Sequence, residues 1–396
     1  MVADGDRDAG AGGMTTRLAD VPTPALILDR VRLVANTGRM TAHVAARGQR
    51  LRPHLKTAKS IDAARHALAG NFGGITVSTL TEAEYFAGHG IADILYAVGI
   101  VPDKLDRVAA LLRRGVALTV ITDDAAIAAA IAAHGTALGL RYPVMVEIDV
   151  GEARGGVHPA SAALLDIGRA LGGSGGAELV GVMAHAGQSY AARSTGAVAE
   201  IAVDEANSAV LAAHRLREIG LECPVVSVGS TPTVLHGPVV EGVTELRCGV
   251  YMFGDLFQAQ IGSCRTEDLA VSVLATVIGH RRDPDRLIID AGALALSKDR
   301  STAGMPLDAG FGVVMQCAGR GLALLLRVDR VYQEHGVIEI ANPALLASFP
   351  VGSRLRVLPN HVCMTAAMYD RYLVVDGGDE VHDTWHRCNG WGEGGV

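Results

Sequence analysis

Short apolar runs alternate with longer helical runs along the first two thirds of the chain. An extended run at 23–29 and a helical pattern to about residue 47 come first. Eight strand candidates then follow in order, at 50–56, 74–80, 93–99, 117–123, 143–150, 179–185, 225–231 and 245–252. These runs are rich in Val and Ile and most are separated by helical stretches, which is typical of a buried parallel sheet. Eight such repeats predict a (β/α)8 barrel, and a doubly wound open sheet is disfavoured because no GxGxxG motif follows the first strand.

The rhythm changes after about residue 266. From there β-type runs follow one another without long helices between them, which predicts a mostly antiparallel C-terminal β domain. We therefore expect a flexible tail at 1–20, a barrel at 21–265 and a β domain at 266–396. The tail is rich in Gly, Ala and Asp and lacks the basic start and apolar run of a signal peptide.

Composition narrows the classes of function. The 396 residues are 49% hydrophobic and 19% charged, so we expect a sizeable core and little disorder. The net charge of −7 is opposite to the basic balance of most nucleic-acid-binding proteins, and no apolar stretch is long enough to cross a bilayer. The six cysteines are scattered singly, without the spacing of a disulfide framework, which favours reduced thiols and a cytoplasmic location.

Polar residues close several of the predicted barrel strands, where barrels of this kind carry their reactive groups. Small and hydroxyl-bearing residues after strands seven and eight suit a phosphate, because glycine lets backbone N–H groups approach an anion and hydroxyls add donors. A lysine on the same rim can form a Schiff base with an aldehyde, although a lone lysine is more often a solvated surface charge. Together these features point to pyridoxal 5'-phosphate (PLP) as cofactor. The candidate residues are Lys56, Arg154, His185, Tyr190, Gly229, Ser230, Thr231, Gly249 and Tyr251.

A second constellation lies in the segment LPNHVCM of the predicted β domain. On an extended strand, His361 and Cys363 would face the same way. Imidazole and thiolate together favour zinc, and two protein ligands leave positions open for water or substrate. The spacing alone equally fits a buried cysteine beside a hydrogen-bonded histidine, so both interpretations stay open.

The segment RPHLKTAKS (52–60) resembles the lysine motif of the D-serine dehydratase and D-threonine aldolase group, which are alanine-racemase-like PLP enzymes of fold type III. The resemblance runs from about residue 22 to 385. It implies a barrel, a C-terminal β domain and a homodimer whose two subunits complete each active site. Further similar segments are TPALILD (23–29), EIDVGEARGGV (147–157), AHAGQSY (184–190), SVGSTPT (227–233), TELRCGVYMFGD (244–255), DAGALALSKD (290–299), QEHG (333–336) and PNHVC (359–363).

The resemblance also implies residue roles. Lys56 matches the lysine that holds PLP and moves the Cα proton, and Arg154 matches an arginine near the phenolic oxygen of PLP. His361 and Cys363 match metal ligands, with zinc preferred and manganese or magnesium as alternatives. Many relatives have histidine where this chain has Ala58, which leaves the tuning of the lysine open. The phosphate-binding segments of the family correspond to Gly229, Ser230, Thr231, Gly249 and Tyr251.

The implied activity is cleavage of a bond at Cβ of a D-3-hydroxy amino acid. We predict elimination to a 2-oxo acid and ammonia, as in D-serine dehydratase, because dehydratase relatives resemble the His-x-Cys pattern whereas D-threonine aldolases more often show His-x-Asp. D-Serine and D-threo-3-hydroxyaspartate are the candidate substrates. The alternatives are a D-threonine or 3-hydroxy-D-aspartate aldolase, an amino-acid racemase and a non-catalytic PLP-binding protein. We assign no catalytic role to Asp290 or Asp299, and we expect Cys388 to be a partly buried free thiol.

Overall fold

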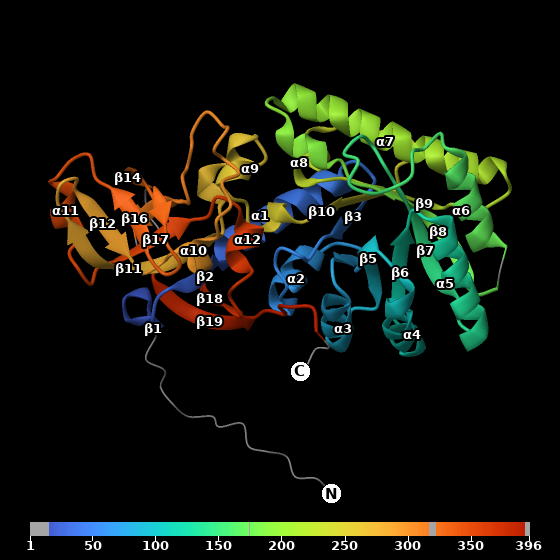
Figure 1. The fold of residues 1–396 in the computed structure, drawn as a ribbon, viewed down its shortest axis with the longest axis horizontal. Coiled ribbons are helices and arrows are strands. Elements are labelled where there is room, and N and C mark those ends of the chain that lie inside the picture. Colours follow the sequence, from blue (N-terminus) through green and yellow to red (C-terminus); the bar gives the residue numbers. More distant parts are fainter. Residues whose placement is uncertain (1–15, 174, 317–321, 393–396) are drawn as a thin grey trace, which may run out of the picture.

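The computed structural model of the chain describes residues 16–173, 175–316 and 322–392. These residues form a barrel and a β domain that lie beside each other (Figure 1). The barrel confirms the predicted fold class, with eight parallel strands in the order β3-β10-β9-β8-β7-β6-β5-β4. Their bounds are β3 (Arg50–Pro53), β4 (Ile75–Val77), β5 (Asp93–Gly99), β6 (Ala117–Thr122), β7 (Tyr142–Ile148), β8 (Ala177–Ala184), β9 (Val225–Val228) and β10 (Glu245–Cys248).

The two end strands of this sheet nearly close the barrel. The Leu55 N–H donates to the Thr76 carbonyl at 2.8 Å, and His54 forms a parallel bridge with Thr76. The side chains of Ile94, Val144 and Val226 on three of the strands are fully buried. Burial of apolar side chains between strands and surrounding helices is what the Val- and Ile-rich runs predict.

Helices connect the barrel strands and cover their outer face (Figure 1). Local signals set several of their ends. The Asp29 carboxylate accepts the N–H groups of Val31 and Arg32 at the start of α1, and Gly139 ends α5 with a left-handed φ of 63°. The bounds are α1 (Arg30–Ala45), α2 (Ile61–Leu68), α3 (Leu80–Gly88), α4 (Leu105–Arg113), α5 (Ala125–Leu138), α6 (Ala162–Gly172), α7 (Thr195–Glu218), α8 (Thr231–His236) and α9 (Leu256–Gln260).

The β domain is mostly antiparallel, as predicted, and its described strands belong to one 11-stranded sheet. Short helices α10 (Ala293–Leu296), α11 (Leu345–Ser348) and α12 (Val362–Ala366) interrupt the strands. The strands are β1 (Thr16–Arg17), β2 (Ala25–Asp29), β11 (Val271–Arg281), β12 (Arg286–Ile289), β13 (Val313–Gln316), β14 (Leu322–Arg327), β15 (Arg330–Val331), β16 (Gly336–Glu339), β17 (Arg354–Leu358), β18 (Arg371–Val375) and β19 (Glu380–His386).

Two N-terminal segments differ from the sequence expectation. The range 21–265 assigned the first extended run to the barrel, but β2 pairs with β11 and β18 of the β domain, where Leu26 and Leu28 are buried. Residues 16–20 of the expected tail are structured, because β1 pairs with β19 and Leu18 is fully buried. Residues 1–15 of that tail lie outside the described residues.

Two further findings concern the helices and the cysteines of the described residues. Across the described ranges, the helices are too short or too polar to cross a membrane. The described cysteines, including Cys363 and Cys388, are free thiols, and Cys388 is half-buried as expected, whereas Cys317 lies outside the described residues.

Candidate active site

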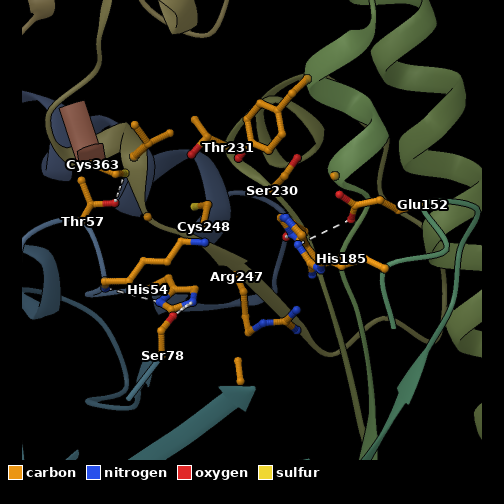
Figure 2. A pocket seen from close by; sticks show the side chains of 18 of the residues that line it. His54, Thr57, Ser78, Glu152, His185, Ser230, Thr231, Arg247, Cys248 and Cys363 are labelled. Atoms are coloured by element: carbon orange, nitrogen blue, oxygen red, sulfur yellow. Dashed lines mark hydrogen bonds and ion pairs between the residues drawn. The ribbon is translucent and has the colours of Figure 1, made fainter. Parts of the chain in front are cut away.

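A cavity of about 820 Å³ lies at the carboxyl ends of the barrel strands, against the β domain. It brings together residues that are far apart in the sequence (Figure 2). Tyr251 is the exception among the predicted site residues, because it is buried after β10 and does not line the cavity. The predicted residues that do line it are Lys56, Arg154, His185, Tyr190, Gly229, Ser230, Thr231, Gly249, His361 and Cys363.

Lys56 reaches the cavity from the turn that follows β3. The turn is anchored to the barrel through His54, whose Nε2 lies 3.4 Å from the Ser78 hydroxyl. The β domain holds the other side of the turn, because the Ala58 carbonyl accepts from the Tyr372 hydroxyl at 2.8 Å and from Arg387 Nε at 3.2 Å. Ala58 itself is fully buried and does not line the cavity. The lysine therefore stands on a turn that both domains fix.

The segment Gly229–Thr231 forms one wall of the cavity. Gly229 has a φ of 126°, and a Cβ there would lie 2.7 Å from the Arg247 carbonyl, so a residue with a side chain does not fit. Ser230 begins α8 with a capping box to Thr233. The Thr231 hydroxyl oxygen is buried and has no hydrogen-bond partner among the described residues. A buried hydroxyl without a partner is expected to bind a polar ligand group.

A buried carboxylate fixes this wall from behind. Glu205 on α7 accepts the N–H groups of both Ala186 and Gly229 on Oε1, each at 2.9 Å. The ring of His185 is tied to the same wall, since its Nδ1 donates to the Gly229 carbonyl at 3.0 Å. Glu205 thereby holds the ends of β8 and β9 at one fixed spacing.

A guanidinium and two histidine rings line the cavity between the barrel strands. Arg247 is buried and donates to the Ser227 hydroxyl at 2.7 Å and to the Ala184 carbonyl at 2.6 Å. Burial lowers the pKa of His54 well below its usual value, and the charges of Lys56 and Arg247 act in the same direction. Burial likewise lowers the pKa of His185 to about 3, against the opposing hydrogen bond to Gly229. Both imidazoles are therefore neutral at physiological pH.

The low pKa of His185 predicts a loss of stability in acid. A histidine in the unfolded chain binds a proton near pH 6.5. As the pH falls below that value toward the folded pKa of about 3, the unfolded state takes up a proton that the folded state does not. The free energy of unfolding of the PLP-free protein should fall by up to about 1.4 kcal/mol per pH unit from this group.

Urea unfolding between pH 7 and pH 5 measures this contribution. The variant His185→Gln should show a flatter dependence of unfolding free energy on pH than the parent chain. His214→Gln is the matched control, because the His214 side chain is 65% exposed. An unchanged slope in His185→Gln would contradict the assignment of a buried neutral imidazole.

The predicted metal pair lies at the start of a helix and not on an extended strand, which is a correction to the sequence expectation. Strand β17 ends at Leu358, His361 is the N-cap of α12 and Cys363 lies in the first turn of that helix. The chain turns here because Asp255 accepts the Val362 N–H at 3.1 Å and the Leu256 N–H donates to the Pro359 carbonyl. Both side chains nevertheless line the cavity.

The side chains of His361 and Cys363 interact with each other and with outer partners. Asp299 Oδ2 lies 2.7 Å from His361 Nδ1. The Thr57 hydroxyl lies 3.2 Å from Cys363 Sγ (Figure 2). Burial acts to raise the pKa of the Cys363 thiol, but the hydrogen bond and charge of His361 outweigh it and lower the pKa. The pair thus combines a nitrogen and a sulfur donor, which are the donor atoms that zinc prefers.

Sequence reasoning missed several groups at this site. Arg247 and Thr57 lie inside the similar segments TELRCGVYMFGD and RPHLKTAKS but were assigned no role, whereas Glu205 lies in a helix outside all of these segments. Asp299 closes the similar segment DAGALALSKD but was assigned no role, whereas it lines the cavity and contacts His361. Asp255 closes another such segment and also lines the cavity, and burial raises its pKa to about 6.

The cavity fits both groups that the sequence suggested. Lys56 lines the same cavity as a wall with a buried, unpartnered hydroxyl and close-approach glycines, which suits an aldehyde that carries a phosphate. Within the described ranges, no group of three or more His, Cys, Asp or Glu side chains could hold a metal. A metal at His361 and Cys363 would therefore have two protein ligands and open positions.

A barrel with this lysine, the Gly229–Thr231 wall and a β domain over its mouth defines the alanine-racemase-like class of PLP enzymes. Residues 28–256 match the alanine racemase N-terminal domain, and residues 270–375 match the serine dehydratase domain. The chain belongs to this family, in the group of PLP-dependent lyases that contains the D-serine dehydratases.

The similarity to individual proteins of this group extends over nearly the whole length of both chains. The D-threo-3-hydroxyaspartate dehydratase of Delftia sp. (strain HT23) is 46% identical over 96% of this chain and 100% of that protein. The D-serine dehydratase of Dictyostelium discoideum is 29% identical over 92% of this chain and 96% of that protein. A 3-hydroxy-D-aspartate aldolase of Paracoccus denitrificans is 31% identical over 93% of this chain and 92% of that protein. The Delftia dehydratase structure superposes with a TM-score of 0.91 at 44% identity, covering 95% of this chain and 100% of that chain. A mutant of that enzyme has been solved in a form described as metal-free.

Proposed function

We propose that this chain is a PLP- and metal-dependent dehydratase that converts a D-3-hydroxy amino acid to a 2-oxo acid and ammonia. The observation that carries the proposal is the meeting of Lys56, the Gly229–Thr231 wall and the His361–Cys363 pair in one cavity. The substrate classes are those of D-threo-3-hydroxyaspartate and D-serine, on which similar proteins act by name.

Lys56 would hold PLP, and its free amine would take the proton from Cα of a bound substrate. The residues that would hold the phosphate are Gly229, Ser230 and Thr231, with the close approach at Gly249, where a Cβ would lie 2.5 Å from the His54 carbonyl. PLP supplies an electron sink for the pair that the Cα proton leaves behind. His185 and Tyr190, which also line the cavity, would contact the cofactor, and Arg154 would lie near its phenolic oxygen.

His361 and Cys363 would hold a divalent metal. A metal there supplies a Lewis acid that assists departure of the β-hydroxyl group. Zinc is preferred because one donor is a sulfur, with manganese and magnesium as alternatives. The metal-free form described for a mutant of the Delftia enzyme supports a metal in this group of proteins.

The preference for elimination over retro-aldol cleavage has two supports. The protein that is 46% identical is a dehydratase, whereas the aldolase of Paracoccus denitrificans is 31% identical. The ligand pattern is His-x-Cys, which resembles the dehydratases.

The test is a product assay with zinc- and PLP-loaded protein. D-threo-3-Hydroxyaspartate, D-serine and D-threonine are incubated separately, and ammonia, glycine and 2-oxo acid are measured, with the L-enantiomers as controls. We expect ammonia and 2-oxo acid in equal amounts, without glycine, from at least one D-substrate. Glycine with an aldehyde as the products would assign the chain to the aldolases, and the absence of any turnover would contradict the proposed function.

We further propose a homodimer with the cavity near the subunit interface. Helices α10 and α12 lie against each other beside the metal pair, and apolar side chains near them are exposed, with Leu294 at 41%, Met364 at 50% and Met368 at 63%. Exposed apolar side chains grouped in this way are typical of an interaction surface. Sedimentation equilibrium of the loaded protein should give the mass of two chains, and a monomer at micromolar concentration would contradict the dimer.

A further inference from the structure

We infer that Asp299 is a positioning residue that orients His361 for metal binding. This inference rests on the proposed metal pair and deepens it. Its basis is the contact of 2.7 Å between Asp299 Oδ2 and His361 Nδ1, made by two side chains that both line the cavity.

The hydrogen bond determines which nitrogen of His361 can bind a metal. A carboxylate accepts and cannot donate, so the imidazole must carry its proton on Nδ1. Once the ring has given up its other proton to bind a metal, the lone pair is on Nε2, at the far side of the ring. A neutral imidazole held in this tautomer is ready to ligate through Nε2, and the carboxylate strengthens that nitrogen as a donor.

Asp299 is itself held in place before any metal binds. Its Oδ1 accepts the Ser301 N–H at 2.8 Å and the Ser301 hydroxyl, while its own N–H donates to the Ser297 hydroxyl at 2.9 Å. These bonds fix the carboxylate from one side and leave Oδ2 for the histidine. A histidine ring held by a fixed carboxylate loses little conformational freedom when it binds a metal.

Asp299 is an outer partner and not a third ligand. Its Oδ2 is engaged at Nδ1, on the opposite side of the ring from the nitrogen that remains for the metal. No described His, Cys, Asp or Glu residues form a three-membered metal-binding group. Cys363 has a separate outer partner in Thr57, whose hydroxyl lies 3.2 Å from Sγ. Loss of Asp299 should therefore weaken the nitrogen ligand and leave the sulfur ligand in place.

The experiment measures metal binding and not activity. PLP-loaded protein is stripped of metal and titrated with Co²⁺, with affinity taken from calorimetry and sulfur ligation from the thiolate-to-cobalt absorption band. The variants are Asp299→Ala, Asp299→Asn and His361→Ala. Asp308→Asn is the matched control, because Asp308 lies nine residues further along the chain, pairs with Arg300 at 2.7 Å and does not line the cavity.

We expect Asp299→Ala to weaken Co²⁺ binding by roughly 10- to 100-fold, with the thiolate band still present at saturation. Asp299→Asn should weaken Co²⁺ binding by a factor at the lower end of that range, because an amide oxygen can still accept from Nδ1 but carries no charge. PLP binding should be unchanged in both variants, and Asp308→Asn should match the parent chain. If Asp299→Ala does not fold, Asp299→Asn alone carries the test.

Two results would overturn the inference, and they are distinguishable. Parent-like Co²⁺ affinity in the Asp299 variants, together with lost affinity in His361→Ala, would refute the role of Asp299 and leave the proposed metal pair intact. Equal affinity in the parent chain and in His361→Ala would refute the metal pair itself, and the inference with it.

Discussion

Replacement of Lys56 by alanine is expected to abolish the covalent attachment of PLP and to lower turnover by roughly 100- to 10,000-fold, the usual contribution of a positioned general base. The physical reason is that, in the proposed function, Lys56 would supply both the amine that holds the aldehyde and the base that takes the Cα proton. Borohydride reduction of the loaded parent chain, followed by peptide mass analysis, should place one reduced phosphopyridoxyl group on the peptide that contains Lys56.

The matched control is Lys59→Arg. Lys59 lies three residues away and pairs with Glu82 at 3.1 Å, and it does not line the cavity. Arginine keeps that ion pair, so the variant should retain PLP and full turnover. Reduced phosphopyridoxyl on Lys59, or undiminished turnover in Lys56→Ala, would remove Lys56 from its proposed role.

Loss of the metal pair is expected to give the second largest effect. Cys363→Ala should lower the elimination rate by about 100- to 1,000-fold, because Lewis-acid assistance contributes several kcal/mol and each 1.36 kcal/mol is tenfold in rate. PLP should remain attached, since Lys56 and the Gly229–Thr231 wall are untouched. Treatment of the parent chain with a chelator should have the same effect, and added Zn²⁺ should restore the rate.

A thiol outside the cavity provides the control for this result. Cys388 is a half-buried free cysteine that follows β19 and does not line the cavity, so Cys388→Ala should keep its metal and its activity. Elimination that continues at the parent rate in Cys363→Ala after complete metal removal would show that the chemistry needs no metal at this pair.

The barrel could be predicted because its signal is local and repeated. Each strand is a short buried run bounded by helices, so the eight candidates from 50–56 to 245–252 all correspond to strands of the barrel. The run at 23–29 has the same local pattern, yet β2 belongs to the other sheet. A strand pattern tells which residues are extended, whereas the choice of sheet depends on partners more than 200 residues away.

The site was predictable where the fold itself gives the position. Residues at the ends of barrel strands converge on one mouth, which is why Lys56, His185 and the Gly229–Thr231 segment could be chosen before the structure was known. Asp299 could not be chosen in this way, because its contact with His361 depends on how two separate segments of the β domain pack. The helix start at His361 was also missed, since tertiary bonds to Asp255 override the extended pattern.

The most direct test of the central claim is a crystal structure of the protein loaded with PLP and Zn²⁺, with anomalous diffraction recorded at the zinc edge. The account predicts PLP joined to Lys56, its phosphate at Gly229–Thr231, and the zinc peak bound by His361 Nε2 and Cys363 Sγ in the same cavity. A phosphate bound away from that wall, or a zinc peak remote from the cofactor, would contradict it.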